Sequence, residues 1–557
     1  MSHMKKLISN RSLFYACWLL FSLVQAAGTE LFDDEAYYWV YSKFLDWGYF
    51  DHPPMIAVLI KAGTILFPGE LGVRFMIVLM GTLSIYIIEK LTRPSDLRLF
   101  YAIVLNIAVL QIGGIIAVPD IPLLFFTALF FLAYKAFAEK SNLINGLLLS
   151  IVIVLLLYSK YHGLLIILAT LGSNLKILKQ PLTWMVVALS VILFLPHVLW
   201  QLQHGLPSLN YHLFERVSPA YSLSFTTDYL AGQLLITGPL LGWLMIWSAF
   251  KYKPVDVTQK AMKWSLSFVY VLFLVSSFKS RTEANWTVPL LVPLIVLAYH
   301  HIQTNEKLIK WIYRALPISL FLILVVRVFM ILDTPLVEKL PKDEFHYNKS
   351  WTSDIKEKSK GLPVVFTNSY QRASKYWFYT GDTAFSLNTH LYRRSNYNFW
   401  PLELQLQQKP VFIVGSKGTA GLSDSLIVGN KSFSIGADPA FQSYSQIVLK
   451  QLGSKVAAKS RSISVTLQVS APSDALLKDA ELHQPEIILI LYPGNKQLPW
   501  LIPTGKKLVL SNTNEVNIQL VIPELDYKDY QIRWGLQGSY VEPSINSSVY
   551  TLSNALY

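Results

Sequence analysis

The sequence predicts a polytopic α-helical membrane protein whose polar C-terminal region combines mixed α/β and β-sandwich structure. Hydrophobic residues occupy 53% of the 557 positions and charged residues only 15%, whereas soluble domains average about 25% charged residues. A soluble chain of this length does not need so much apolar surface, because it divides into domains with cores of limited size. A soluble enzyme, a disordered chain and a collagenous chain are therefore excluded.

Apolar stretches are the first observation behind this prediction, because a membrane-spanning helix needs about 20 mostly apolar residues. Eleven such stretches precede the polar region. The predicted spans are 11–29, 72–90, 99–118, 121–138, 143–159, 162–178, 182–200, 229–250, 263–279, 286–302 and 311–332.

Positive charge is distributed unevenly between the two alternating sets of loops. With the N-terminus in the cytoplasm, the cytoplasmic loops and span ends carry 17 Lys and Arg residues, against 8 on the outer side. Membrane proteins concentrate Lys and Arg in their cytoplasmic loops, so the count predicts a cytoplasmic N-terminus and an extracytoplasmic C-terminal region. The net charge of +13 reflects the same bias, and nucleic acid is therefore not predicted as a partner.

The chain changes character after residue 332. Residues 363–366 are predicted to form a strand and 370–379 a helix. Further short β-rich runs, separated by Pro, Gly and Asn turns, are found at 411–414, 462–469, 487–491 and 516–522. The predicted domains are a transmembrane domain over 1–332, an extracytoplasmic mixed α/β domain over 333–430 and an extracytoplasmic β-sandwich-like domain over 431–557.

The first long outer loop begins with three adjacent carboxylates, Asp33, Asp34 and Glu35. Acidic groups beside hydrocarbon cost free energy and are generally functional, although acids also favour the first turn of a helix. The aromatic residues that follow recur at helical intervals and predict an amphipathic helix over 34–46 that lies along the membrane. Because this helix would direct its acidic end toward the protein, we favour a functional role for the acids.

A second acid, Asp120, lies in a turn between Pro119 and Pro122. Two interpretations are equally compatible with this position. Asp120 is either the N-cap of the helix that follows or a member of a functional site. The turn alone does not decide between them.

Two further outer turns carry cations against the charge bias. One turn contains Lys160 and His162, and the other contains Lys279, Arg281 and Glu283. Long cationic side chains often extend from a span to the membrane surface, which is the alternative explanation. Cations grouped with carboxylates at one face of the membrane nevertheless fit a site that binds an anionic group and moves a proton.

Five motifs in these loops resemble, as an ordered set, the membrane glycosyltransferases of the GT-C fold. The closest branch is the bacterial one that contains the lipid A aminoarabinose transferase and is related to protein O-mannosyltransferases. The resemblance covers about residues 10–335. The motifs are Asp-Glu-Ala-Tyr-Tyr (34–38), His-Pro-Pro (52–54), Pro-Asp-Ile-Pro-Leu (119–123), Ser-Lys-Tyr-His-Gly (159–163) and Glu-Ala-Asn-Trp (283–286).

The resemblance implies an inverting glycosyltransferase of the bacterial cytoplasmic membrane. Such an enzyme takes a sugar from a polyprenyl-phosphate donor and transfers it, at the periplasmic face, to a lipid, glycan or protein acceptor. An oligosaccharyltransferase with a lipid-pyrophosphate donor, a polytopic transporter or flippase of lipid-linked sugar, and a receptor are the alternatives. The sugar, the acceptor and the oligomeric state are left open.

The resemblance also implies roles for individual residues. Asp34 corresponds to the catalytic acid of the first loop, with Glu35 beside it, and Asp120 corresponds to the second acid. His52 stands where the aminoarabinose transferases have a lysine that meets the donor phosphate. The remaining predicted cationic contacts to this phosphate are Lys160, His162, Lys279 and Arg281, and the other predicted lining residues are Tyr37, Tyr38, Asp51, Glu283 and Trp286.

Metal binding is left open. Cys17, the only cysteine, lies within the first span, so neither an intramolecular disulfide nor a cysteine-based metal site is predicted. A divalent ion that bridges Asp51 or Asp120 and a histidine is compatible with the residues present. No ligand spacing is specific enough to assign one.

Overall fold

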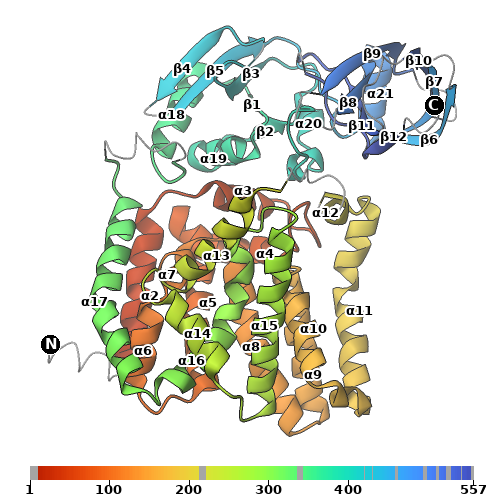
Figure 1. Ribbon diagram of the computed structural model, residues 1–557. Coiled ribbons are helices and arrows are strands. Elements are labelled where there is room, and N and C mark those ends of the chain that lie inside the picture. Colours follow the sequence, from red (N-terminus) through yellow and green to blue (C-terminus); the bar gives the residue numbers. More distant parts are fainter. Residues whose placement is uncertain are drawn as a thin grey trace. The chain divides into compact units, whose positions relative to one another are not determined.

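The computed structural model divides the chain into two compact units, Met1–His346 and Tyr347–Tyr557. We describe each unit by itself (Figure 1). The residues that the structure describes are 11–211, 221–334, 343–419, 421–428, 431–457, 462–492, 499–509, 514–521, 529–540 and 542–553.

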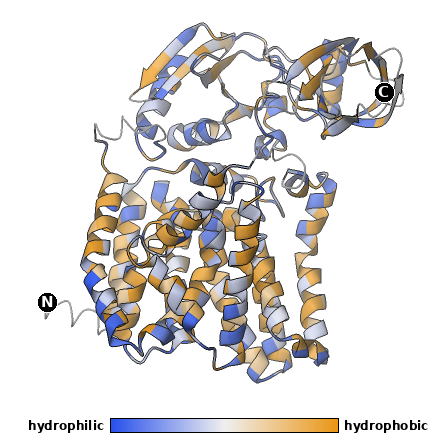
Figure 2. Cartoon of the chain, in the orientation of Figure 1, coloured by the Kyte–Doolittle hydropathy of each residue, from blue (hydrophilic) through white to orange (hydrophobic). Residues whose placement is uncertain are grey.

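The first unit is α-helical, and its helices are apolar along most of their length (Figure 2). Short turns connect them at both ends, where polar side chains gather. The helices are α2 (Arg11–Gly28), α3 (Asp33–Tyr41), α4 (Met55–Leu66), α5 (Gly69–Thr92), α6 (Leu97–Leu105), α7 (Ala108–Gln111), α8 (Asp120–Glu139), α9 (Leu143–Ser159), α10 (Gly163–Ser173), α11 (Pro181–Gln203), α12 (Pro207–Asn210), α13 (Leu223–Thr237), α14 (Gly242–Lys251), α15 (Val257–Ser277), η4 (Ala284–Leu290), α16 (Leu291–Ile302) and α17 (Glu306–Phe329).

Within the described residues, five helices are long and apolar enough to cross a membrane, and up to eight spans result if each bent helix pair counts as one. Shorter apolar helices include α9 and α10, which coincide with two predicted spans. The membrane-type helical fold is therefore confirmed, whereas the number eleven stays a prediction.

Two of the predicted spans are not continuous helices. The span over 99–118 bends by 81° after α6, and the span over 229–250 bends by 88° between α13 and α14. The two breaks meet in space, because a Cβ atom on Gly238 would lie 2.6 Å from the backbone oxygen of Asn106. Gly238 also has a positive φ of 127°, so this close approach requires a glycine.

The loop after α2 differs from its predicted form in two ways. The acidic helix exists as α3 but ends at Tyr41, and its residues from Glu35 to Tyr41 are all buried. The predicted helix over 34–46 therefore ends five residues early, and it has no exposed polar face from Glu35 onward, because packing encloses its side chains on all faces. Its predicted position along the membrane stays a prediction. The same loop contains α4, whose 12 residues are fewer than the about 20 that a membrane span needs. The search for spans therefore does not predict this helix.

The second unit begins with a five-stranded sheet in the order β2-β1-β3-β5-β4. The strand β1 is parallel to its two neighbours, β2 and β3, and β5 is antiparallel to both β3 and β4. The helices α18 (Asn348–Ser359) and α19 (Tyr370–Thr380) belong to this part of the chain. The strands are β1 (Val364–Thr367), β2 (Ala384–Leu387), β3 (Val411–Ser416), β4 (Asp424–Val428) and β5 (Lys431–Asp438).

The domain boundary placed after residue 430 falls inside this sheet. Residues 429 and 430 lie outside the described part of the chain, but β4 and β5 on either side of them form one antiparallel pair. The sheet therefore continues to Asp438, and the predicted boundary is about eight residues too early by that measure. Connections between strands and domain boundaries share a polar, glycine-containing composition, so this composition does not distinguish the two.

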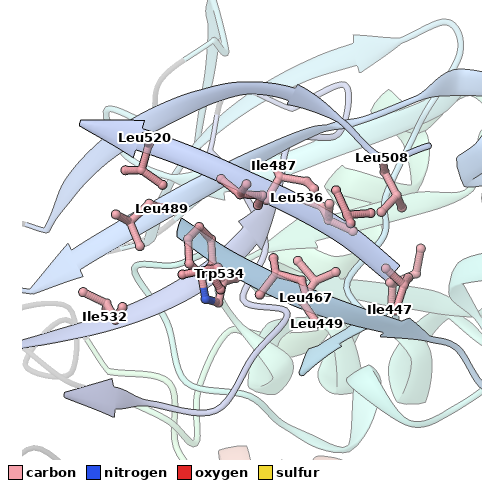
Figure 3. Packing of buried hydrophobic residues seen from close by; sticks show 14 of the residues in the cluster. Ile447, Leu449, Leu467, Ile487, Leu489, Leu508, Leu520, Ile532, Trp534 and Leu536 are labelled. Atoms are coloured by element: carbon pink, nitrogen blue, oxygen red, sulfur yellow. The ribbon is translucent and has the colours of Figure 1, made fainter. Parts of the chain in front are cut away.

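The rest of this unit consists of two antiparallel sheets, in the orders β10-β7-β6 and β12-β11-β8-β9. Both sheets contribute to one buried apolar core, the arrangement of a β-sandwich (Figure 3). On β10, Val516, Ile518 and Leu520 are buried and alternate with polar residues, as a half-buried strand requires. The elements are β6 (Val448–Ala457), β7 (Ser462–Ser470), α21 (Asp474–His483), β8 (Glu486–Tyr492), β9 (Trp500–Lys507), β10 (Glu515–Val521), β11 (Asp529–Leu536) and β12 (Tyr550–Ser553).

Trp534 at the centre of this core provides a test of the packing. Its side chain is 0% exposed, and its indole N–H donates to the Oε1 atom of Gln451 at 3.1 Å. Trp534→Phe should lower the free energy of unfolding of this unit by about 1–2 kcal/mol, because it loses the hydrogen bond and some packing volume. Trp500→Phe on β9, where the tryptophan is 36% exposed, should change it much less. Urea unfolding of the purified chain measures both, and equal effects would contradict the assigned core.

Candidate functional site

A fully buried ion pair joins the acidic turn of α3 to α5. The guanidinium of Arg74 donates from Nε to Oε1 of Glu35 at 2.7 Å and from Nη2 to Oε2 at 2.5 Å. Both side chains are 0% exposed. Arg74 also donates to the backbone oxygens of Ala26, Thr29 and Glu30, so it holds the end of α2 and the segment that leads into α3.

Glu35 reaches a second segment of the site. Its Oε1 atom accepts the backbone N–H of Ala117 at 2.7 Å, and its Oε2 atom accepts that of Phe32 at 2.9 Å. The hydrogen bond from Ala117 ties the start of α3 to the turn that carries Asp120. Asp34, next to Glu35 in the first turn of α3, is only partly buried.

Asp120 is part of a polar cluster with two other turns. Its Oδ1 atom lies 2.8 Å from the Nζ atom of Lys160, and its Oδ2 atom accepts a hydrogen bond from the Nδ2 atom of Asn285 at 3.2 Å. Asp120 and Lys160 are both buried. The helix N-cap is Pro119, with no capping bond from a side chain, so the alternative of Asp120 as the N-cap is wrong.

The same pair of turns carries an aromatic cluster. The ring of His162 lies 5.4 Å from that of Trp286 and 5.6 Å from that of Phe273 on α15, measured between ring centroids. His162 and Trp286 follow Lys160 and Asn285 by two residues and one residue, respectively. The 159–163 turn and the 283–286 turn are therefore joined by both a polar and an aromatic contact.

The cations at the end of α15 are more exposed than Lys160. Arg281 Nε lies 3.1 Å from Glu283 Oε1, with 66% of the arginine side chain exposed. Lys279 is also exposed. Both precede Asn285 in the same connection, so they lie near the Asp120 cluster in the sequence.

Asp51 lies beside the aromatic face of α3. Its Oδ2 atom accepts hydrogen bonds from the hydroxyls of Tyr37 and Tyr41, each at 3.3 Å. The ring of Tyr38 lies 5.5 Å from that of His52. The predicted residues of this loop, Tyr37, Tyr38, Asp51 and His52, are therefore brought together.

The segment before Asp51 is anchored on α11, through residues that the sequence did not single out. The Nε1 atom of Trp200 donates to Asp46 at 2.7 Å, and the Nδ1 atom of His197 lies 2.8 Å from the backbone oxygen of Trp47. A Cβ atom on Gly48 would lie 2.5 Å from the Trp200 ring, so only glycine permits this approach. A lone His and Trp within an apolar span carry no signal of such a role.

The described contacts thus form two groups. Glu35, Asp120, Lys160, His162 and Trp286 belong to segments joined through the 117–120 turn, and the residues from 37 to 52 form the second group. Ser208 connects the two groups, because it accepts a hydrogen bond from the hydroxyl of Tyr161 and donates one to the backbone oxygen of Phe50. In the described residues, no set of three or more His, Cys, Asp or Glu side chains is arranged to hold a metal ion.

Comparisons with known proteins show which proteins this chain resembles. Residues 51–200 match the family model described as dolichyl-phosphate-mannose-protein mannosyltransferase. The lipid A galacturonosyltransferase RgtD of Rhizobium johnstonii is 26% identical over 290 residues, which span 48% of this chain and 60% of that protein, less than two thirds of its length.

Solved structures extend the comparison to the fold. The apo structure of ArnT from Cupriavidus metallidurans matches with a TM-score of 0.57 at 13% identity, covering 76% of this chain and 97% of ArnT. The structure of the same protein bound to undecaprenyl phosphate matches with a TM-score of 0.55. The predicted resemblance to the GT-C membrane glycosyltransferases is confirmed. The match to the family model contains Asp51, Asp120, Lys160 and His162, but lies after Asp34 and before the 283–286 turn.

Proposed function

We propose that this protein is an inverting glycosyltransferase that takes a sugar from a polyprenyl-phosphate donor at the outer face of the bacterial cytoplasmic membrane. The buried Asp120–Lys160 ion pair, which also accepts a hydrogen bond from the exposed Asn285 and is tied through the 117–120 turn to the acidic start of α3, is the observation that carries the proposal. A lipid acceptor is favoured over a protein or a glycan, because RgtD is a lipid A galacturonosyltransferase. The undecaprenyl phosphate bound in one ArnT structure supports a polyprenyl-phosphate donor.

Asp34 is the proposed general base. A base that removes the proton of the acceptor hydroxyl contributes typically 10²–10⁴-fold to the rate. Asp34 stands in the first turn of α3, where the helix N-terminus favours the ionised carboxylate. It is partly exposed, so an acceptor can approach it, whereas Glu35 beside it is enclosed.

Glu35 is better explained as a positioning residue than as the second catalytic acid. Its two oxygens are engaged by Arg74 and by the N–H groups of Phe32 and Ala117. A carboxylate so held does not reach an acceptor. We assign Glu35 the role of fixing the position of Asp34 relative to the turn that carries Asp120.

The leaving phosphate of the donor requires positive charge rather than a general acid, because a lipid phosphate is already a good leaving group. Lys160 is oriented by Asp120 and stands next to His162. Exposed Lys279 and Arg281 supply further charge at the same set of turns. Cations aimed at the developing charge lower the barrier to transfer. His52, Tyr37, Tyr38 and Asp51 are proposed to line the opposite side of the donor.

Arg281 offers a test of this charge without disturbing a buried contact. Arg281→Gln should raise the apparent KM for the donor about 10–100-fold, since a charge-assisted hydrogen bond contributes about 1.5–3 kcal/mol. Arg314→Gln, an exposed arginine on α17, should leave the KM unchanged. Steady-state kinetics over a range of donor concentrations measures both. Equal constants for the two variants would assign Arg281 to the membrane surface.

The proposed activity is tested by reconstitution. The purified chain in lipid nanodiscs is mixed with a radiolabelled sugar on a C55 polyprenyl monophosphate and with a lipid A acceptor, and labelled lipid A is expected. Transfer only from a pyrophosphate-linked oligosaccharide to a peptide would identify an oligosaccharyltransferase instead. Movement of the donor across vesicles without transfer would identify a flippase.

The proposed orientation is tested independently of the activity. The excess of Lys and Arg on one side motivates an outer location for the second unit. A reporter enzyme that is active only in the periplasm, fused to the C-terminus, should give a positive signal. The same reporter fused before residue 11 should give none. The reverse result would overturn the orientation.

A further inference from the structure

An apolar cavity of about 470 Å³ lies between α2, α6, α7 and α17, away from the acidic turn of α3. This volume is within the range of about 300–1,000 Å³ that single bound ligands occupy. Phe21 and Leu324 line it and are 67% and 57% exposed. The cavity therefore opens onto the apolar outer surface of the helices, where lipid is the solvent if these helices span the membrane.

The polar groups of the cavity gather at one end. Arg327 of α17 lines it, and its Nη2 atom donates to the backbone oxygen of Gln111 at 2.5 Å. Gln25 of α2 donates to the backbone oxygen of Arg327, and Ser22, one turn earlier on α2, also lines the cavity. Phe14 and Leu316 line the opposite, apolar end.

Arg327 has an unfilled donor. Its Nε atom is buried and has no hydrogen-bond partner among the residues that the structure describes, and no described carboxylate lies within 4.0 Å of it. A charged side chain among membrane-spanning helices is costly unless it is paired, and a buried polar atom without a hydrogen-bond partner is rare enough to require an explanation, such as a bound group that accepts its hydrogen. The guanidinium is directed inward to Gln111, which is not the arrangement of an arginine that extends to the membrane surface.

The length of the cavity indicates which ligand fits. Along α17 it is lined by Leu316, Leu320, Ile323, Leu324 and Arg327, a stripe of about 16 Å at 1.5 Å per residue. Half of the hydrocarbon thickness of a bilayer is about 15 Å. One acyl chain of one leaflet therefore matches the apolar stripe, with an anionic headgroup at Arg327. A long polyprenyl chain exceeds it.

We propose that this cavity binds one acyl chain of a membrane glycerophospholipid, whose phosphate accepts the Nε–H of Arg327. The lipid fills the space between α2 and α17 on the leaflet next to α3. The proposal does not depend on the catalytic roles assigned above, since none of the cavity residues takes part in them.

Native mass spectrometry of the detergent-purified full chain tests the proposal without donor or acceptor. The wild type should retain one glycerophospholipid, identified after release by tandem mass spectrometry. Arg327→Gln should reduce the retained fraction at least about 10-fold, by loss of a charge-assisted hydrogen bond. Arg314→Gln, on the same helix but outside the cavity, is the matched control and should retain the lipid. Leu320→Trp keeps Arg327 but fills the cavity, and it should also lose the lipid.

Cys17 supplies a second readout, because it lines the cavity and is the only cysteine in the chain. N-ethylmaleimide should label it faster in lipid-depleted protein, and adding dioleoyl phosphatidylglycerol should slow the labelling again. The proposal is overturned if the wild type retains no lipid or retains a polyprenyl phosphate. It is equally overturned if both Arg327→Gln and Leu320→Trp retain a glycerophospholipid.

Discussion

Replacing Asp34 by Asn should lower the rate of sugar transfer by at least about 10²-fold while donor binding stays intact. Asparagine has nearly the same size and keeps an oxygen that accepts hydrogen bonds, but it cannot take the proton of the acceptor. Rates of transfer in nanodiscs and donor binding by the same preparation are the two measurements. A loss of both would indicate a misfolded loop rather than a missing base.

The neighbouring acids are matched controls for Asp34. Asp33→Asn changes the same turn of α3 by the same chemical step, and its effect should be milder. If Asp34→Asn transfers sugar at the parental rate while Asp120→Asn is inactive, the base has been misassigned. If all three variants remain active, the proposed transfer mechanism is wrong.

Breaking the Glu35–Arg74 pair should have the largest effect on stability. Arg74→Met leaves the carboxylate of Glu35 fully buried without its partner, and such a loss costs about 3–5 kcal/mol. It also frees the backbone oxygens of Ala26, Thr29 and Glu30 that Arg74 binds. Thermal unfolding in detergent measures the loss of stability. Transfer activity should fall as well, because Arg74 no longer holds Glu35, whose carboxylate binds the N–H of Ala117.

A double-mutant cycle separates the pair from its surroundings. Glu35→Gln combined with Arg74→Met should cost clearly less than the sum of the two single variants, because no uncompensated charge remains. Lys310→Met in the exposed Lys310–Glu306 pair is the control and should cost less than about 1 kcal/mol. Additive single effects would mean that the 2.5 Å contact contributes no pairing energy.

Composition and local patterns were sufficient to predict the class of the protein, because a membrane-type helical fold depends on them. Apolar stretches of about 20 residues predict helices wherever they occur, and β-rich runs such as 487–491 and 516–522 appear as β8 and β10. The acidic first turn of α3 was predictable for the same local reason. The predicted GT-C resemblance also came from short motifs in order along the chain.

Where local signals were ambiguous, the sequence predicted the wrong limits. The helix α4 has only 12 residues, which is too few for a membrane span, so the search for apolar stretches does not predict it. The bends at Asn106 and Gly238 interrupt apolar stretches whose composition is continuous. The helix α3 ends at Tyr41 rather than at residue 46, and its residues from Glu35 to Tyr41 are buried on all faces, because neighbouring segments cover them.

The pairing of charged side chains could be identified from the three-dimensional packing but not from the sequence. Glu35 pairs with Arg74, 39 positions away, and Asp120 meets Lys160 and Asn285 at 40 and 165 positions. In the sequence, Arg74 is an ordinary cation near a span end, and Glu35 and Asp34 are equivalent neighbours. The distinction between an enclosed carboxylate and an accessible one arises from how the helices pack, since burial and pairing depend on atoms that are distant along the chain.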